Sequence, residues 1–254
     1  MQLFDLKGRV AVITGGNGGI GLGMAKGMAA AGAAIVVAGR NEKKNDAAVR
    51  EIRSAGGKAE AVVVDVVDEA SCRAMCEAAA KAFGRLDILA NNAGMSIRKQ
   101  PETFTLAEWK QVIDTNLNAA FVCSQAAYPH MQTAGGGKII NTGSMLSIFG
   151  TAYAAPYAAS KGGIVQMTKA LASAWAKDNI QVNAILPGWI DTELTRDARA
   201  QVEGLHERVL ARTPAGRWGE PADFAGIAVF LASKASDFVS GAAITVDGGY
   251  SIQG

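Results

Sequence analysis

Seven short apolar runs alternate along the chain with longer amphipathic segments, and this alternation constrains the fold more than any other feature. The apolar runs span residues 10–14, 34–38, 61–65, 86–90, 138–141, 181–186 and 243–246. They are continuously apolar, as parallel strands are when helices cover both faces of their sheet. The amphipathic segments span residues 20–31, 42–55, 69–83, 106–131, 156–177 and 221–232. We therefore predict an α/β fold with a doubly wound parallel sheet and helices on both faces.

The length and composition suit one large domain. The 254 residues are 49% hydrophobic and 19% charged, which allows a sizeable core and excludes collagen, coiled coil and intrinsic disorder. No repeat, linker or low-complexity tract divides the sequence, so we expect residues 1–254 to form a single domain. The stretch 187–221 is rich in Gly and Pro and reads as irregular. We expect residues 188–220 to form a substrate lid over the carboxyl ends of the strands.

Charge and hydropathy argue against several kinds of partner. Lys and Arg number 25 and Asp and Glu 23, which gives a net charge of +2 without a basic stripe, so we expect no nucleic acid. Apolar stretches such as residues 33–38 are far too short to cross a bilayer, and the first residues lack the profile of a signal peptide. Three cysteines are too few for a disulfide framework. These features predict a cytoplasmic protein with no membrane partner.

A glycine-rich turn follows the first predicted strand and opens the first predicted helix. It reads Thr14-Gly15-Gly16-Asn17-Gly18-Gly19-Ile20-Gly21 and fits both GxGxxG and TGxxxGxG. Glycines there allow the backbone to approach a pyrophosphate, and the helix N-terminus supplies free N–H groups and a positive partial charge. The alternative is a tight turn that binds nothing. The strand–turn–helix context favours a dinucleotide site.

The end of the second predicted strand distinguishes the two nicotinamide cofactors. An acidic residue there would accept a hydrogen bond from the ribose 2′-hydroxyl of NAD. The sequence has Gly39-Arg40-Asn41 instead, with no carboxylate. The guanidinium of Arg40 suits a 2′-phosphate, although Arg40 can equally be a solvated residue that opens the next helix. We predict NADP, with NAD as the alternative.

Two further loops belong to the same edge of the predicted sheet. Asp65 and Val66 end the third strand, where the carboxylate of Asp65 can accept from an adenine amino group or cap the following helix. Asn91-Asn92-Ala93-Gly94 ends the fourth strand. Small residues there let the backbone pass close to a ribose, and an Asn side chain can tie neighbouring strands together.

The chemistry-bearing residues come later in the chain. Tyr157 and Lys161 stand four apart, which places both on one face of a helix. A nearby ammonium and an oxidised nicotinamide would lower the pKa of the phenol toward neutrality, although a lone Tyr on a helix is usually a packing residue. Ser144 follows the fifth strand, where it can hold a substrate oxygen or merely cap a loop. Asn116 lies inside a predicted helix, where it can hold a water that links Lys161 to solvent.

Other chemistries find less support. Cys72 and Cys76 share a helix face, but no His or further Cys joins them, so we predict no metal site. Gly143-Ser144-Met145 is not the GxSxG elbow of a serine hydrolase, and neither His130 nor His206 has a supporting motif. A nucleotide-binding regulator without turnover stays open as an alternative, although it would not need the set of Asn, Ser, Tyr and Lys residues.

The ordered combination of these motifs, together with Pro187-Gly188, resembles the short-chain dehydrogenase/reductase family over essentially the whole chain. The resemblance implies a Rossmann-like sheet of seven strands in the order 3-2-1-4-5-6-7, a catalytic tetrad and a homotetramer. The tetramer would pack the helices at 106–131 and 156–177 against a neighbour and use the final strand in a second interface. The implied tetrad is Asn116, Ser144, Tyr157 and Lys161. The predicted cofactor-binding residues, including Arg40 and Asn41 from the argument above, are Gly15, Asn17, Gly18, Ile20, Arg40, Asn41, Asp65, Val66, Asn92, Ala93, Gly94, Tyr157, Lys161, Pro187, Gly188, Ile190 and Thr192.

The implied reaction transfers a hydride between a nicotinamide and a secondary alcohol or ketone, with Tyr157 as acid and base. The predicted substrate pocket is lined by residues 95–99, 145–149, 153 and 189–194, where Arg98 and Lys99 can pair with a carboxylate or remain solvated. Several stretches, including Ser144-Met145-Leu146-Ser147 and residues 214–219, resemble the sugar-acid members of the family, such as gluconate 5-dehydrogenases and 2-deoxy-gluconate 3-dehydrogenases. We therefore predict a sugar acid or polyol as the small-molecule substrate, with a 3-oxoacyl thioester as the alternative.

Overall fold

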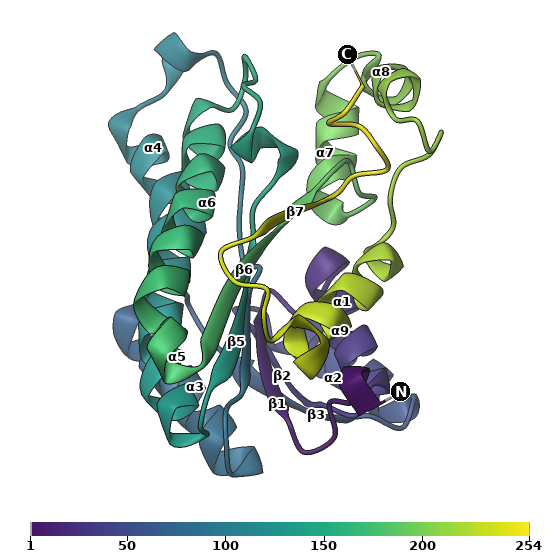
Figure 1. Cartoon of the computed structure of the whole chain (residues 1–254). Helices are drawn as coiled ribbons and strands as arrows, with labels where there is room; N and C mark the ends of the chain where they lie inside the picture. The colour runs from purple at the N-terminus through teal and green to yellow at the C-terminus, as the bar shows by residue number, and fades with distance from the viewer. Residues whose placement is uncertain (1, 254) are drawn as a thin grey trace.

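A parallel sheet runs through the molecule, and its strand order is the predicted one. The computed structural model describes residues 2–253. The sheet has seven strands in the order β3-β2-β1-β4-β5-β6-β7, and every neighbouring pair is parallel (Figure 1). The strands are β1 (Val10–Thr14), β2 (Ala34–Gly39), β3 (Lys58–Val63), β4 (Ile88–Asn91), β5 (Gly137–Thr142), β6 (Ile180–Pro187) and β7 (Ala243–Val246).

Helices cover both faces of this sheet. Figure 1 shows α3, α5 and α6 on one face and α1, α2 and α9 on the other, with α7 and α8 above the carboxyl ends of the strands. The α-helices are α1 (Gly19–Ala30), α2 (Glu42–Ser54), α3 (Glu69–Phe83), α4 (Leu106–Ile113), α5 (Ala119–Thr133), α6 (Ala155–Trp175), α7 (Glu193–Gln201), α8 (Leu205–Arg212) and α9 (Ala225–Ala232).

The core consists of two apolar layers, one on each side of the sheet. Successive residues of a strand point to opposite faces, so Val10 and Val12 pack into the layer beneath α3 and α5. Ala11 and Ile13 pack into the layer beneath α1 and α9. Both faces of the central strands are therefore dry, which explains why their sequences are continuously apolar.

The edge strand β3 begins earlier than its apolar run suggested. The sequence predicted a strand at residues 61–65, whereas β3 spans Lys58–Val63. Lys58 pairs with Ala34 of β2, and Lys58 and Glu60 are exposed while Ala59 between them is buried. An edge strand has a solvated side, so its first half alternates polar and apolar residues and does not form a continuous apolar run.

Two further expectations about local structure are wrong. The predicted helix at 106–131 is divided by one π-helical turn at Asp114–Asn118, between α4 and α5. The stretch 187–221, predicted as irregular, contains α7 and α8. The sequence of α7 is strongly polar, and of its residues only Ala198 is buried. Its apolar face is narrow, because only Leu194 and Ala198 stand at helical spacing within it. The glycine- and proline-rich surroundings therefore favoured the prediction of an irregular segment.

Candidate active site

The carboxyl ends of β1, β4, β5 and β6 open into two adjoining cavities of about 450 and 270 Å³. Ser144, which follows β5, and Tyr157, on α6, line both of them. The loop after β6 and the first turn of α7 also border both cavities, through Gly188, Leu194 and Thr195. The predicted chemical residues therefore lie at the boundary between two spaces.

The larger cavity gathers most of the residues predicted to bind a cofactor. Those that line it are Gly15, Asn17, Gly18, Ile20, Asn92, Ala93, Gly94, Tyr157, Lys161, Pro187, Gly188, Ile190 and Thr192. They come from loops that lie far apart in the sequence and meet because parallel strands present their carboxyl ends at one edge. Arg40, Asn41, Asp65 and Val66 do not line it.

The glycine-rich turn forms a close-packed cradle at one end of this cavity. A Cβ atom on Gly21 would lie 2.3 Å from the carbonyl oxygen of Gly15, so α1 can approach β1 only because residue 21 is a glycine. Gly18 stands at the N-cap of α1 and has no side chain to bond the first N–H groups of the helix. A Cβ on Gly18 would meet nothing within 4 Å. Uncapped N–H groups beside open space fit the pyrophosphate of a dinucleotide.

Asparagine side chains brace the cradle against β4. Asn92 donates from Nδ2 to the carbonyl oxygens of Thr14 and Gly15, at 3.2 and 3.3 Å. Asn91 donates from Nδ2 to Oδ1 of Asn141 on β5, at 2.8 Å. The expectation that an Asn here ties neighbouring strands together is confirmed by these bonds.

The four predicted residues outside the cavity follow the carboxyl ends of β2 and β3. Arg40 is exposed at the end of β2, and Asn41 caps α2 by accepting from the backbone N–H of Lys44. Asp65 is exposed beyond β3 and accepts from the backbone N–H of Val67. The idea that Asp65 caps the following helix is wrong, because Asp68 is the N-cap of α3.

Asn45 is a buried polar residue beside the glycine-rich cradle, and the sequence analysis missed it. It is fully buried, and its Nδ2 donates to the carbonyl oxygens of Gly39 and Val62 at 2.8 and 3.2 Å. Its Oδ1 accepts from Nδ2 of Asn17 at 2.6 Å. Asn45 therefore joins the ends of β2 and β3 to a side chain of the cradle. The available signal was a polar residue on the buried face of an amphipathic helix.

Lys161 and Tyr157 project from one face of α6, as their spacing predicted. The ammonium of Lys161 lies 5.6 Å from the centre of the Tyr157 ring and donates to the carbonyl oxygen of Thr142 at 2.7 Å. Lys161 is 4% exposed, and its burial lowers its pKa to about 8.

The pKa of Tyr157 differs from the sequence-based expectation. Burial raises the pKa of its phenol, while the hydroxyl of Ser144 and the charge of Arg98 act in the opposite direction. Lys161 was expected to lower this pKa. In the structure its ammonium is directed to Thr142, and the groups that favour the phenolate are Ser144 and Arg98.

Asn116 and Ser144 are held by backbone contacts. Asn116 lies in the π-helical turn and forms two bonds with the backbone of Met95, accepting from its N–H at 2.8 Å and donating to its oxygen at 2.9 Å. A Cβ on Gly94 would lie 3.2 Å from Oδ1 of Asn116 and 3.7 Å from Nζ of Lys161, so both polar groups face the same small residue. The hydroxyl of Ser144 accepts from the N–H of Leu146.

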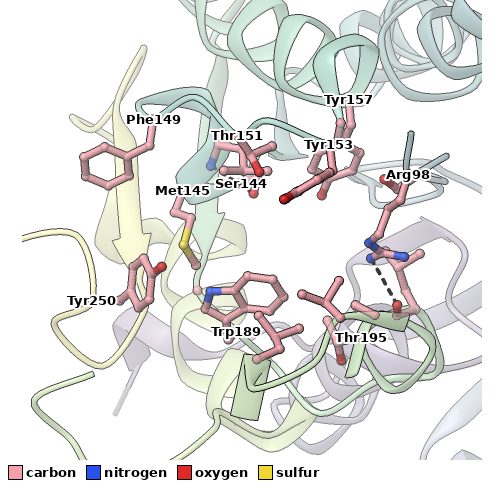
Figure 2. A pocket seen from close by; sticks show the side chains of 18 of the residues that line it. Arg98, Ser144, Met145, Phe149, Thr151, Tyr153, Tyr157, Trp189, Thr195 and Tyr250 are labelled. Atoms are coloured by element: carbon pink, nitrogen blue, oxygen red, sulfur yellow. Dashed lines mark hydrogen bonds between the residues drawn. The ribbon is translucent and has the colours of Figure 1, made fainter. Parts of the chain in front are cut away.

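The smaller cavity lies on the other side of Tyr157, and Figure 2 shows Arg98 and several of its aromatic side chains. The predicted segments contribute Ser96 and Arg98, then Met145, Leu146 and Phe149, then Tyr153, Trp189 and Leu194. Lys99 does not line it and instead forms an ion pair with Glu108. The sequence analysis missed the contributions of α8 and of Tyr250, which reach the cavity only through the packing of distant segments.

Arg98 is the polar group best placed to meet an anion beside Tyr157. Figure 2 shows its guanidinium at one end of the cavity, bonded to the carbonyl oxygen of Leu194 at 3.4 Å. It has no ion-pair partner within residues 2–253. Burial lowers the pKa of Arg98, which means that its desolvated charge is not fully compensated by its neighbours.

Residues 2–253 contain no group of three or more His, Cys, Asp or Glu side chains arranged to hold a metal ion. Within the same residues, none of the helices combines the length and hydropathy needed to span a membrane.

Comparison with known proteins gives consistent matches over the whole chain. A family model described as enoyl-(acyl carrier protein) reductase matches residues 15–251. The 2-dehydro-3-deoxy-D-gluconate 5-dehydrogenase of Escherichia coli (strain K12) is 42% identical over 251 residues, which cover 98% of this chain and 98% of that protein. Gluconate 5-dehydrogenase of Gluconobacter oxydans (strain 621H) is 40% identical over 251 residues, covering 99% and 98%.

A solved structure matches equally well. It is a gluconate 5-dehydrogenase from Burkholderia cenocepacia J2315 in complex with NADP and tartrate, 42% identical, with a TM-score of 0.94 over 100% of this chain and 99% of that one. The seven-stranded parallel sheet agrees with the fold of this structural match. The chain belongs to the short-chain dehydrogenase/reductase family.

Proposed function

We propose that this protein is an NADP(H)-dependent oxidoreductase that interconverts a secondary hydroxyl and a ketone on a sugar acid. The single observation that carries the proposal is the position of Tyr157 and Ser144, which line both the larger cavity and the smaller cavity beside it. A group that transfers a proton must reach a substrate oxygen while the carbon beside it faces the cofactor. The boundary between the two cavities meets that requirement.

Each residue of the predicted tetrad has a separate role in this reaction. A nicotinamide dinucleotide held by the residues that line the larger cavity would supply the hydride acceptor for oxidation and the hydride donor for reduction. Tyr157, as phenolate, takes the proton of the substrate hydroxyl during oxidation and returns it during reduction. Ser144 holds the substrate oxygen beside the phenol. Lys161 hydrogen-bonds to a ribose hydroxyl, and Asn116 holds a water that passes the proton toward solvent.

Arg40 supplies the preference for NADP in this proposal. It stands exposed next to Gly39, and a Cβ on Gly39 would lie 2.6 Å from Nδ2 of Asn17, a side chain that lines the larger cavity. Arg40 therefore follows a residue that packs against the wall of the larger cavity, and in this proposal the adenosine of the cofactor binds at that end. A planar cation at this position suits the 2′-phosphate of NADP. NADP is also the cofactor present in the Burkholderia structure.

Arg98 supplies the preference for an acid. Its partly desolvated guanidinium gains a counter-ion when a carboxylate enters the smaller cavity. The hydroxyls of Ser96, Thr151 and Tyr153 line the same cavity and can bond the hydroxyls of a sugar chain. The named activities of the Gluconobacter and Escherichia relatives are on gluconate and a keto-deoxy-gluconate.

The test is a screen of the purified protein with NADP⁺ or NADPH, followed at the absorbance of the reduced cofactor. We expect turnover with gluconate and keto-gluconates and little with uncharged polyols. Tyr157→Phe is expected to lose at least 99% of the rate, since general acid–base groups contribute about 10²–10⁴-fold. Its affinity for NADPH should stay near that of the parent protein.

Two outcomes would contradict the proposal. If 3-oxoacyl thioesters react while sugar acids do not, the protein is a thioester reductase and Arg98 has a different partner. If NADPH binds but no alcohol, ketone or thioester in the screen reacts, the alternative of a regulator without turnover gains support. A Tyr157→Phe variant that keeps the parent rate would remove the acid–base assignment.

We also propose a cytoplasmic location for this protein. Cys72, Cys76 and Cys123 are all buried as free thiols. Unpaired cysteines are typical of reducing compartments, where disulfides do not persist.

A further inference from the structure

The smaller cavity carries more positive charge than one carboxylate can neutralise. Arg98, Arg208 and Arg212 line it. None of the described residues that line it is an Asp or a Glu. The excess of cations over anions is local, because the chain as a whole has a net charge of only +2.

The arginines stand in two separate groups. Arg98 belongs to the loop after β4, whereas Arg208 and Arg212 belong to α8. Figure 2 shows Arg98 at one end of the cavity and Phe149 and Tyr250, the rings that hold Arg212, at the other, with Met145 and Trp189 between them. Ser144 and Tyr157 also lie between the two ends, so the reacting carbon of a bound substrate is flanked by cations on both sides.

Arg212 is held in place by aromatic rings and not by an acid. Its guanidinium carbon lies 4.5 Å from the centre of the Tyr250 ring and 5.2 Å from that of Phe149. Rings contact the faces of a guanidinium and leave its N–H edges free for a bidentate acceptor. Within residues 2–253, neither Arg212 nor Arg208 forms an ion pair.

The neighbouring helix provides a contrast. Arg196 and Arg199 on α7 both form ion pairs with Asp191, at 3.0 and 2.6 Å. The arginines of α7 therefore have their counter-ion within the protein, and those of α8 that face the cavity do not. An unpaired guanidinium that is orientated by two rings at a cavity wall is preorganised for an anion from outside.

We propose that the end of the cavity at Arg212 is a second anion subsite, and that the preferred substrate is a sugar acid with an anionic group at each end. The two chemical forms that meet this description are aldaric acids, with a second carboxylate, and phosphorylated aldonic acids. This inference rests on the proposed function, in which Arg98 binds the first carboxylate. Arg212 contacts the second anion, and Arg208 adds to the positive field around it.

The experiment compares three acids that differ only at the far end. D-Gluconate ends in a primary hydroxyl, D-glucarate in a carboxylate and 6-phospho-D-gluconate in a phosphate. Initial rates with NADP⁺ give kcat/KM for each acid. Calorimetric titration of the protein saturated with NADPH, which cannot oxidise a hydroxy acid, gives the dissociation constant of each acid without turnover. Both measurements are made on the parent protein, Arg98→Met, Arg212→Met and Arg73→Met.

We expect the parent protein to bind glucarate or phosphogluconate at least tenfold more tightly than gluconate. Arg212→Met should weaken the preferred dianion about tenfold, because it removes a charge-assisted bidentate bond, and should affect gluconate much less. Arg98→Met should weaken all three acids. Arg73, on the outer side of α3, is the matched control, and its replacement should leave every constant unchanged.

The outcomes separate this inference from the proposed function. If no acid is turned over but glucarate binds more tightly than gluconate through Arg212, the proposed reaction is wrong and the subsite stands. If gluconate reacts and neither dianion binds more tightly, the subsite is overturned and the proposed reaction stands. Equal losses for gluconate and glucarate in Arg212→Met would also overturn it, because the residue would then act on the shape of the cavity alone. Preference for glucarate over phosphogluconate, or the reverse, identifies the second anion.

Discussion

Lys161 shows at the scale of one residue how a site needed for chemistry conflicts with stability. Its ammonium is almost fully buried and donates a hydrogen bond to the carbonyl oxygen of Thr142 at 2.7 Å. Burial lowers its pKa from 10.5 to about 8. A pKa that is depressed in the folded state means that the protonated form costs free energy on folding. Residues retained at this cost are commonly functional.

Replacing Lys161 with Met is expected to stabilise the protein at pH 7. Below pH 8 the lysine is protonated in both states, and the shift of its pKa from 10.5 to about 8 corresponds to a folding penalty of about 3 kcal/mol. Loss of the bond to Thr142 offsets about 1–2 kcal/mol of the gain. Urea denaturation should therefore show Lys161→Met more stable by about 1–2 kcal/mol at pH 7, while its activity is lost.

The pH dependence gives the sharper check. Between pH 8 and 10.5 the unfolded chain binds more protons at Lys161 than the folded one, so the parent protein gains stability as the pH rises through this window. The advantage of Lys161→Met should shrink over the same range. Lys169→Met, on an exposed position of α6, is the control and should show no such trend. An advantage that is absent at pH 7, or constant to pH 10, would contradict the assignment.

Among the helices, strands and turns, the sequence predicted those that depend on the pattern of neighbouring residues. The apolar runs located β1, β2 and β4 to within a few residues, and the glycine spacing located the cradle before α1. Contacts between segments that lie far apart in the chain could not be predicted from the sequence. Tyr250 lines the smaller cavity because the C-terminal segment packs beside the end of α8. The N–H of Ala215, just after this helix, donates to the carbonyl oxygen of Gly248. No local pattern encodes such a return.

The contact between α2 and the glycine cradle is another long-range feature, and it has consequences for the cofactor. Asn45 lies on α2 and bonds Asn17 across 28 positions of the chain. It also bonds the ends of β2 and β3, so one amide fixes three elements. We expect its role to be the placement of the adenosine end of the site and not contact with the cofactor.

Replacing Asn45 with Leu is expected to raise the KM for NADP⁺ about tenfold and to leave kcat within about twofold, since the chemical residues lie at the other end of the cavity. The carbonyl of Val62 and the amide of Asn17 lose their partner, which should also cost about 1–3 kcal/mol of stability. Steady-state kinetics well below the melting temperature measure the first effect, and urea denaturation measures the second.

Val49→Ala is the matched control for Asn45→Leu. Val49 is buried on the same helix at 6% exposure and has no bond to the cradle, so its truncation destabilises α2 without releasing Asn17. An equal rise in KM in both variants would show that Asn45 acts only through stability. Arg40→Ala provides a second comparison, because it should weaken NADP⁺ and leave NAD⁺ nearly unaffected, whereas Asn45→Leu should weaken both.

At the scale of the whole molecule, large apolar side chains remain exposed on the outer helices. Leu106 and Trp109 on α4 are 67% and 37% exposed, and Phe121 on α5 is 44% exposed. At the other side of the sheet Phe238, in the segment before the edge strand β7, is fully exposed. These places coincide with the two interfaces expected for a homotetramer of this family. Apolar surface of this kind is commonly covered by a second copy.

We therefore expect sedimentation velocity to give a species of about 105 kDa, four times the 26.2 kDa of one chain. Phe121→Arg should reduce it to a dimer, because each copy would bury an unpaired charge in the interface through α4 and α5. Val63→Arg, on the opposite edge strand β3, changes an apolar residue that is 57% exposed and lies outside both predicted interfaces, and it should leave the tetramer intact. A monomeric parent protein, or a tetramer that survives Phe121→Arg and dissociates with Val63→Arg, would show that these apolar residues are not where the copies meet.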